Sequence, residues 1–136
     1  KGKGAFLNGK PVQVSDAGTL IKSLLATSFP SSEGELMQTA LQNYVHLTRL
    51  TQGVRRMGSA ALDMVYVAAG RLDGYWSNSI HTWDIAAGAL IIAEAGGIVT
   101  DARGTPGFMQ PPCSVLAASR IMHPILLAEL NRNGKM

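Results

Sequence analysis

Residues 83–97 constrain the fold more than any other stretch of this sequence. Up to residue 95 only Asp84 and Glu94 carry a charge, and Gly96-Gly97 then supplies a helix stop. A helix that is apolar on nearly all sides is a buried one, so we expect a core helix here. Asp84 then lies in its first turn, where unpaired amides and the positive end of the helix dipole favour a carboxylate.

Two interpretations of Asp84 follow from its position. Capping of a helix start is the commoner use of an aspartate in a first turn. Alternatively, a carboxylate fixed on a rigid buried helix serves as a ligand for a hard cation or as a polar anchor for a substrate. The spacing of the residues alone leaves both interpretations open.

Strands and helices are expected to alternate along the chain. The tight-turn pair Asn8-Gly9 separates two short extended pieces within residues 1–14. Further strands are expected near residues 24, 54, 73, 98 and 114, and helices over 33–50, 58–70, 83–95 and 122–132. Ser32 and Glu35 form a predicted capping box, and residues 133–136 a frayed tail. This alternation predicts a layered α/β domain with one sheet flanked by helices.

The segment Gly58-Ser59-Ala60 lies where a strand is expected to turn into a helix. Small residues at such a turn let a ligand approach the backbone, and free amides there favour anions or hydroxyls. Close packing of the helix on the sheet would explain the small residues equally well.

Composition excludes several classes of protein. With 46% hydrophobic and 15% charged residues in 136, the chain is expected to form one globular domain rather than a disordered segment. No charge-free apolar run reaches the roughly 18 residues of a membrane span. A net charge of +3 with one small basic cluster, Arg55-Arg56, is too little for a nucleic-acid interface. A single cysteine, Cys113, and the lack of an apolar leader predict a cytoplasmic protein.

Two motifs resemble the C-terminal signature of the inositol monophosphatase family. They are residues 83–88 (Trp-Asp-Ile-Ala-Ala-Gly) and residues 94–101 (Glu-Ala-Gly-Gly-Ile-Val-Thr-Asp). Residues 4–9 (Gly-Ala-Phe-Leu-Asn-Gly) resemble a segment near the middle of a complete family member. The resemblance implies the C-terminal half of a five-layered αβαβα sandwich. Residues 1–14 would be a hairpin belonging to the sheet of the N-terminal half, and residues 15–136 the C-terminal α/β domain.

The resemblance implies magnesium-dependent hydrolysis of a small phosphate monoester, inositol monophosphate above all. Asp84 matches the family's aspartate that ligates a catalytic Mg²⁺ and contacts the substrate. Gly58, Ser59 and Ala60 match a turn that lines the substrate pocket. Ser77 stands where animal members have a glutamate that hydrogen-bonds inositol, and its hydroxyl is shorter and uncharged. Another phosphatase of the superfamily, acting on histidinol phosphate, fructose bisphosphate or a phosphoadenosine nucleotide, therefore stays open.

The family's other metal ligands lie in its N-terminal half, within a glutamate and an Asp-Pro-(Ile/Leu)-Asp-Gly-Thr motif that this sequence lacks. Asp63, Asp73 and Asp101 are dispersed and are expected to be structural. One aspartate with a few waters is a poor Mg²⁺ site. We therefore expect this chain alone to be inactive and to act with the N-terminal half as its partner, in a homodimer as is common in the family. A non-catalytic binding or scaffold role is the remaining alternative.

Overall fold

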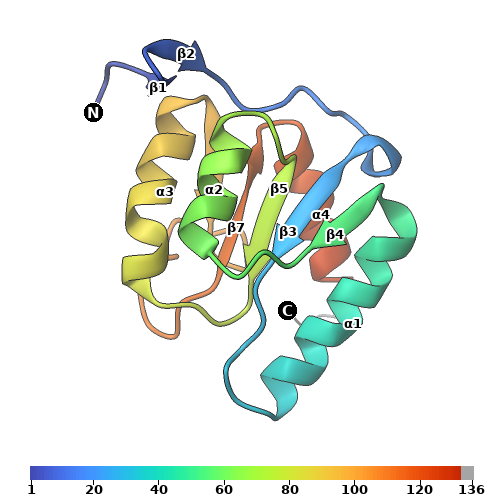
Figure 1. Ribbon diagram of the computed structural model, residues 1–136. Coiled ribbons are helices and arrows are strands. Elements are labelled where there is room, and N and C mark those ends of the chain that lie inside the picture. Colours follow the sequence, from blue (N-terminus) through green and yellow to red (C-terminus); the bar gives the residue numbers. More distant parts are fainter. Residues whose placement is uncertain (133–136) are drawn as a thin grey trace.

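Strands and helices follow one another in the predicted order (Figure 1). The computed structural model describes residues 1–132, and the tail predicted for residues 133–136 lies outside them. The strands are β1 (Ala5–Leu7), β2 (Lys10–Val12), β3 (Leu24–Thr27), β4 (Gly53–Arg55), β5 (Gly74–Ser77), β6 (Gly97–Thr100) and β7 (Val115–Ser119). The helices are α1 (Glu35–Leu50), α2 (Ala60–Ala68), α3 (Thr82–Glu94) and α4 (Met122–Leu130), with a short 3-10 turn at Leu20–Lys22.

Five of the strands form one mixed sheet in the order β4-β3-β5-β7-β6. β3 runs parallel to both of its neighbours, whereas β7 runs antiparallel to β5 and β6. The register pairs Ala26 with Tyr75 and Trp76 with Leu116 across the centre of the sheet. All four central residues are buried, so the middle of the sheet is covered on both faces.

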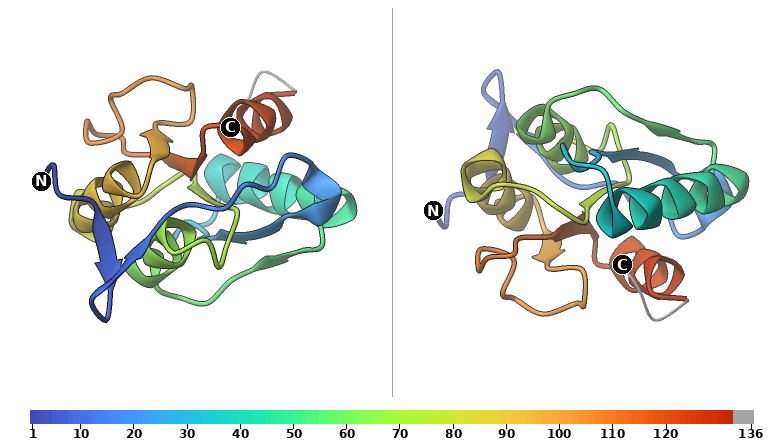
Figure 2. Two further views of the ribbon diagram at one scale, coloured as in Figure 1. Left: turned by 90° about the horizontal axis from the view of Figure 1, so that it is seen from above. Right: turned by 90° about the horizontal axis from the view of Figure 1, so that it is seen from below.

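Helices cover the two faces of this sheet in pairs. Ala26 and Tyr75 pack into a core with α2 and α3, while Trp76 and Leu116 pack into a second core with α1 and α4. Figure 2 shows the resulting layers, with the sheet between the two helix pairs. Because neighbouring residues of a strand point to opposite faces, β3, β5 and β7 each contribute to both cores. The predicted layered α/β arrangement is confirmed.

α2 and α3 approach each other closely at Gly88. A Cβ atom at that position would lie 2.7 Å from Cβ of Met64. A glycine therefore lets α3 lie directly against α2, so that the two helices form one packed layer.

The two extended pieces near the N-terminus form a separate antiparallel hairpin, β1-β2. Asn8 and Gly9 have φ values of 51° and 76°, as a tight two-residue hairpin turn requires. The hairpin lies beyond the α2-α3 layer (Figure 2). The backbone amides of Gly2 and Gly4 donate to the carboxylate of Glu94, and the amide of Val14 donates to the carbonyl of Ala95 at 3.1 Å. The end of α3 thus anchors the first part of the chain.

Two local predictions were wrong. The capping box does not form, because the N-cap of α1 is Gly34, with φ of 125°, in place of Ser32. α3 is not buried on all sides either, since Trp83 is 75% exposed and Leu90 is 45% exposed. The sheet and α2 cover only part of α3, and the side away from them stays open to solvent.

Candidate functional site

α2 and α3 both begin at the edge of the sheet where the parallel strands β3 and β5 end (Figure 1). Ligands of α/β proteins bind outside the carboxyl ends of parallel strands, and helix N-termini there attract anions. The residues predicted for the site all lie at this edge: Gly58, Ser59, Ala60, Ser77 and Asp84.

Asp84 lies in the first turn of α3 and is partly exposed. The N-cap is His81, whose side chain makes no capping bond, and the Asp84 amide donates to the His81 carbonyl at 3.1 Å. Within residues 1–132 the Asp84 carboxylate has no hydrogen-bond partner. A carboxylate that caps its helix would accept a backbone amide, so the structure offers no such bond in support of the capping interpretation. The oxygens of Asp84 are left available to an outside ligand.

The turn at Gly58-Ser59-Ala60 opens α2. Gly58 has φ of 87° with open space around its missing Cβ, so the backbone conformation calls for glycine there and packing does not. Ser59 is the N-cap, and its hydroxyl accepts the Leu62 amide at 3.3 Å. Ser59 is exposed and Ala60 begins the helix with its side chain buried. Amides of the first turn are thus presented at the same edge as Asp84.

Ser77 ends β5 and is fully buried. Its hydroxyl donates to the carbonyl of Ser79 at 2.9 Å and lies 3.4 Å from the carbonyl of Ser28. Two residues earlier on the same face of the strand, the Tyr75 hydroxyl donates to Oγ of Ser28 at 2.8 Å. The hydroxyl of Ser77 therefore already has partners in the backbone, and a substrate would have to compete with them.

Asp63 was not expected at the site. Its side chain is fully buried in the first turn of α2, and neither carboxylate oxygen has a partner within residues 1–132. Burial raises the pKa of Asp63 to about 6. Burial also raises the pKa of Tyr75, and the charges of Asp63 and Asp84 raise it further, against the lowering effect of the Ser28 hydrogen bond. The only signal in the sequence is a single acid within the apolar helix expected over residues 58–70.

Asp73 and Asp101 have structural partners. Asp73 accepts the Leu24 amide at 2.6 Å and the Ser15 hydroxyl, and so fastens the start of β3. Asp101 accepts the amides of Arg103 and Thr105 at 2.9 and 2.8 Å. Burial acts to raise the pKa of Asp101, but these hydrogen bonds and that of the Thr105 hydroxyl outweigh it and lower the pKa.

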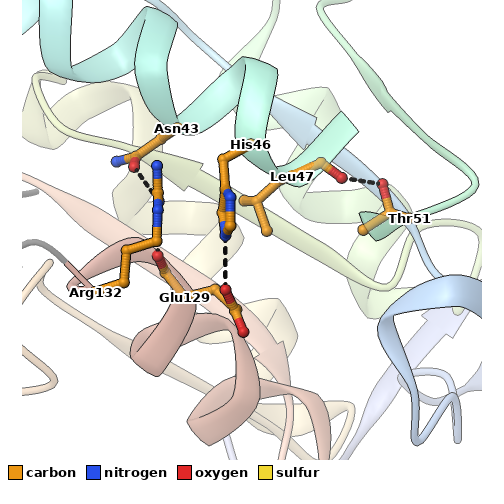
Figure 3. Close-up of polar contacts among 6 residues, drawn as sticks. All are labelled: Asn43, His46, Leu47, Thr51, Glu129 and Arg132. Carbon is orange, nitrogen blue, oxygen red and sulfur yellow. Dashed lines mark hydrogen bonds and ion pairs between the residues drawn. The ribbon is translucent and has the colours of Figure 1, made fainter. Parts of the chain in front are cut away.

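His46 lies on α1, on the other side of the sheet from Asp84. Figure 3 shows its ring facing Glu129 of α4, with Nε2 2.7 Å from the carboxylate. Beside it Arg132 donates to the Asn43 side chain at 3.0 Å and to the carbonyl of Glu129 at 2.8 Å. Across the described chain, residues 1–132, no three His, Cys, Asp or Glu side chains are grouped to hold a metal ion. His46 thus joins α1 to α4 through Glu129.

Comparison with known proteins places these observations in a family. The model of the inositol monophosphatase family matches residues 1–135. Inositol-1-monophosphatase of Synechocystis sp. is 53% identical over 97 residues, which are 71% of this chain and 34% of that protein. Nus factor SuhB of Pseudomonas aeruginosa is 43% identical over 114 residues, which are 81% of this chain and 41% of that protein.

A solved structure shows the same fold. The extragenic suppressor protein suhB of Bartonella henselae superposes with a TM-score of 0.90 at 37% identity, covering 96% of this chain and 50% of that one. The chain therefore spans between about a third and a half of the length of these relatives. In the part of the chain described here, none of the helices has the length and apolar character needed to cross a membrane.

Proposed function

Since this chain belongs to the inositol monophosphatase family, we propose that it forms the C-terminal half of a magnesium-dependent phosphatase that hydrolyses inositol monophosphate. The observation that carries the proposal is the Asp84 carboxylate, which stands without an internal partner beside the open first turns of α2 and α3. Asp84 would ligate a catalytic Mg²⁺ and contact the substrate. The turn at Gly58, Ser59 and Ala60 would hold the substrate through backbone amides and the Ser59 hydroxyl.

The residues of this chain fit a magnesium ion only in part. Asp84 supplies the hard carboxylate oxygen that Mg²⁺ prefers, but no second acidic ligand is grouped with it in residues 1–132. A bound Mg²⁺ would supply charge neutralisation and an activated water at neutral pH. The remaining ligands would come from the N-terminal half, in keeping with the expectation from the sequence.

An exposed apolar surface supports the N-terminal half as partner. The hairpin and the outer sides of α2 and α3 enclose a hollow of about 390 Å³. Phe6, Leu62 and Leu90 line it and are each at least 45% exposed. Contiguous apolar surface of this kind marks an interaction site. The open edges of the hairpin would let it join the sheet of the N-terminal half, as predicted for residues 1–14.

The test of the proposed function is Asp84→Asn in the whole protein. The amide keeps the shape of the side chain but removes the anionic ligand, so we expect unchanged circular dichroism and a loss of turnover of at least about 100-fold. Asp16→Asn removes a charge from an exposed loop residue and should leave turnover unchanged. Magnesium-dependent phosphate release that survives Asp84→Asn would contradict the proposed role.

Inositol monophosphate is proposed as the substrate from the family and from the names of the relatives. Ser77 is the reason to test other phosphate monoesters as well. Its buried hydroxyl offers a smaller and neutral contact than a glutamate would. A panel of inositol monophosphate, histidinol phosphate, fructose bisphosphate and a phosphoadenosine nucleotide would rank them by kcat/KM. We propose a cytoplasmic location, in keeping with the free, buried thiol of Cys113, and a homodimer, as expected from the family.

A non-catalytic binding role is the second candidate. It is favoured by the name of the Pseudomonas aeruginosa relative, which is called a Nus factor. The two candidates differ in magnesium binding. Failure of the whole protein to bind Mg²⁺ would favour the binding role.

A further inference from the structure

Residues 56–58 lead from β4 into the proposed substrate-binding turn, and few contacts hold them. All three residues are exposed, and within residues 1–132 they make no hydrogen bond through backbone or side chain. Gly58 has a φ of 87° and open space around its missing Cβ. Ser59, which follows them, is tied to α2 by its cap on the Leu62 amide. Segments with so few contacts open easily, so a contact that fixes this one bears directly on the site.

Arg56 supplies such a contact. Its guanidinium lies over the ring of Phe29, with Cζ 5.2 Å from the ring centre. A cation over the face of an aromatic ring is attracted by the electrons of the ring. Within residues 1–132 Arg56 forms no ion pair, so the ring is its partner there. β3 and β4 are parallel neighbours, and Phe29 and Arg56 both follow the carboxyl ends of these strands. The contact thus joins two loops at the edge of the sheet where α2 and α3 begin.

Phe29 is held in turn by Tyr44 of α1. The two rings meet edge to face, with their centres 5.6 Å apart and their planes at 85°. Tyr44 packs against the core between the sheet and the helices α1 and α4. A line of contacts therefore runs from that core through Tyr44 and Phe29 to Arg56, which lies two residues before Gly58.

We infer that Arg56 is a positioning residue for the substrate. Stacked on Phe29, it fixes the segment that leads into the turn at Gly58-Ser59-Ala60, so the free amides at the start of α2 keep one direction. Glycine by itself allows many backbone conformations, so Gly58 alone does not fix that direction. Donors that are already in place bind a ligand without the entropic cost of ordering them. The inference rests on the proposed function, in which this turn holds the substrate.

A direct contact between the charge of Arg56 and the phosphate group of the substrate is the competing explanation. Arg56 is exposed at the same edge, so its position does not separate the two explanations. Phe29 separates them, because a direct contact needs Arg56 alone, whereas positioning needs the guanidinium and the ring together. If the inference holds, the two side chains act as one unit, and the effects of removing them are not additive.

The test is steady-state kinetics of the whole protein with Arg56→Met, Phe29→Leu and the double variant. Methionine keeps an unbranched side chain without the charge, and leucine keeps an apolar side chain without the ring. We expect each single variant to raise KM about 2- to 5-fold, the range that corresponds to an exposed cation–π contact. We expect kcat to stay unchanged, because the turn binds substrate and transition state alike. The double variant should have the same KM as the single variants.

Two controls separate the contact from its parts. Phe29→Trp keeps an aromatic face for the guanidinium and should keep the wild-type KM. Arg120→Met removes an equal charge from an exposed residue that follows β7, near the start of β5 and so at the opposite ends of the strands. It should leave KM unchanged.

Nuclear magnetic resonance relaxation gives a second measurement, which does not depend on activity. In the whole protein without substrate, the order parameters of the Gly58 and Ser59 amides should be about 0.85, as in rigid backbone. In Arg56→Met and Phe29→Leu they should fall toward about 0.6, as in flexible backbone.

The outcomes distinguish the inference from the proposed function. An unchanged KM in Phe29→Leu would overturn the inference, and a raised KM in Arg56→Met would then point to the direct contact. Additive effects in the double variant, or unchanged order parameters in both single variants, would overturn it as well. In each of these cases the proposed function stands. Absence of phosphate release by the wild type from every phosphate monoester tested would overturn both.

Discussion

The carboxylates of Asp84 and Asp63 both lie in first helix turns at one edge of the sheet, and neither has a hydrogen-bond partner within residues 1–132. They differ in their exposure to solvent. Asp84 is partly exposed at the start of α3, so an outside ligand can reach it. Asp63 is closed off inside the α2-α3 layer, so only its charge can act beyond its own contacts. A carboxylate is thus accessible to an outside ligand at position 84 and is a buried titratable group at position 63.

The burial of Asp63 gives the stability of the protein a pH dependence that can be measured. Its pKa is raised from 3.8 to about 6 by folding, so its contribution is fully present below pH 3.8 and is lost as the pH rises through 6. That loss is about 3 kcal/mol at pH 8. We expect the free energy of unfolding of Asp63→Asn, measured with urea in the presence of a chelator, to fall less between pH 4 and pH 8 than that of the wild type. If the free energies of unfolding of the two proteins changed equally with pH, the raised pKa of Asp63 would be contradicted.

The sequence predicts where Asp84 and the Gly58 turn lie at this edge, but it does not predict the buried position of Asp63. Asp84 and the Gly58 turn were predictable because helix starts and turns are set by a few neighbouring residues and by recognisable motifs. The isolation of Asp63 was not predictable, because it depends on what β5 and α3 place around α2. A lone acid in an apolar helix is compatible with an exposed position as well as with a buried one.

At the level of elements, α2 and α3 act as one layer because Gly88 lets them touch. Glycine inside a helix is unfavourable by about 1 kcal/mol relative to alanine, so its presence in α3 calls for a packing reason. The short distance to Met64 provides one. Both helices begin at the candidate site, so their mutual position sets the distance between Asp84 and the Ser59 turn.

Gly88→Ala should therefore destabilise the protein. The added methyl group would lie 2.7 Å from Cβ of Met64, an atom fixed to the backbone. Overpacking of this kind destabilises a protein by about 1–3 kcal/mol. The higher helix propensity of alanine offsets at most about 1 kcal/mol of that loss. Urea unfolding should show the net loss, and Ala87→Gly on the exposed side of α3 measures the propensity contribution separately. A Gly88→Ala variant more stable than the wild type would contradict the prediction and would mean that α2 and α3 can move apart to accommodate the methyl group.

The open side of α3 shows where element-level prediction fails. Apolar character on all sides predicted a helix surrounded by its own domain, yet Trp83 and Leu90 are exposed. A hydrophobic pattern alone does not show how much of a helix its own domain covers. The order of strands and helices, in contrast, was predicted throughout, because it rests on local periodicity.

At the scale of the whole molecule, residues 1–132 present a partly exposed Asp84 carboxylate without an internal partner and an exposed apolar surface between the hairpin and the α2-α3 layer. Both features agree with the proposed function, in which this chain works together with an N-terminal half. We expect the isolated 136-residue chain to show no magnesium-dependent phosphatase activity, because a single aspartate is a poor Mg²⁺ site and no three His, Cys, Asp or Glu side chains are grouped within residues 1–132. The measurement is phosphate release at saturating Mg²⁺, with the whole protein as the positive control. Activity in the isolated chain above that of Asp84→Asn in the same chain would contradict the expectation.

The hydrogen bonds from Gly2 and Gly4 to Glu94 also bear on how the molecule assembles. Gly2 and the residue that holds it are 92 positions apart in the sequence. A ribosome makes a chain from its amino end, so Gly2 and Gly4 emerge well before their anchor on α3 exists. Contacts of such long range form slowly. The bonds from Gly2 and Gly4 to Glu94 thus cannot form until α3 has been synthesised.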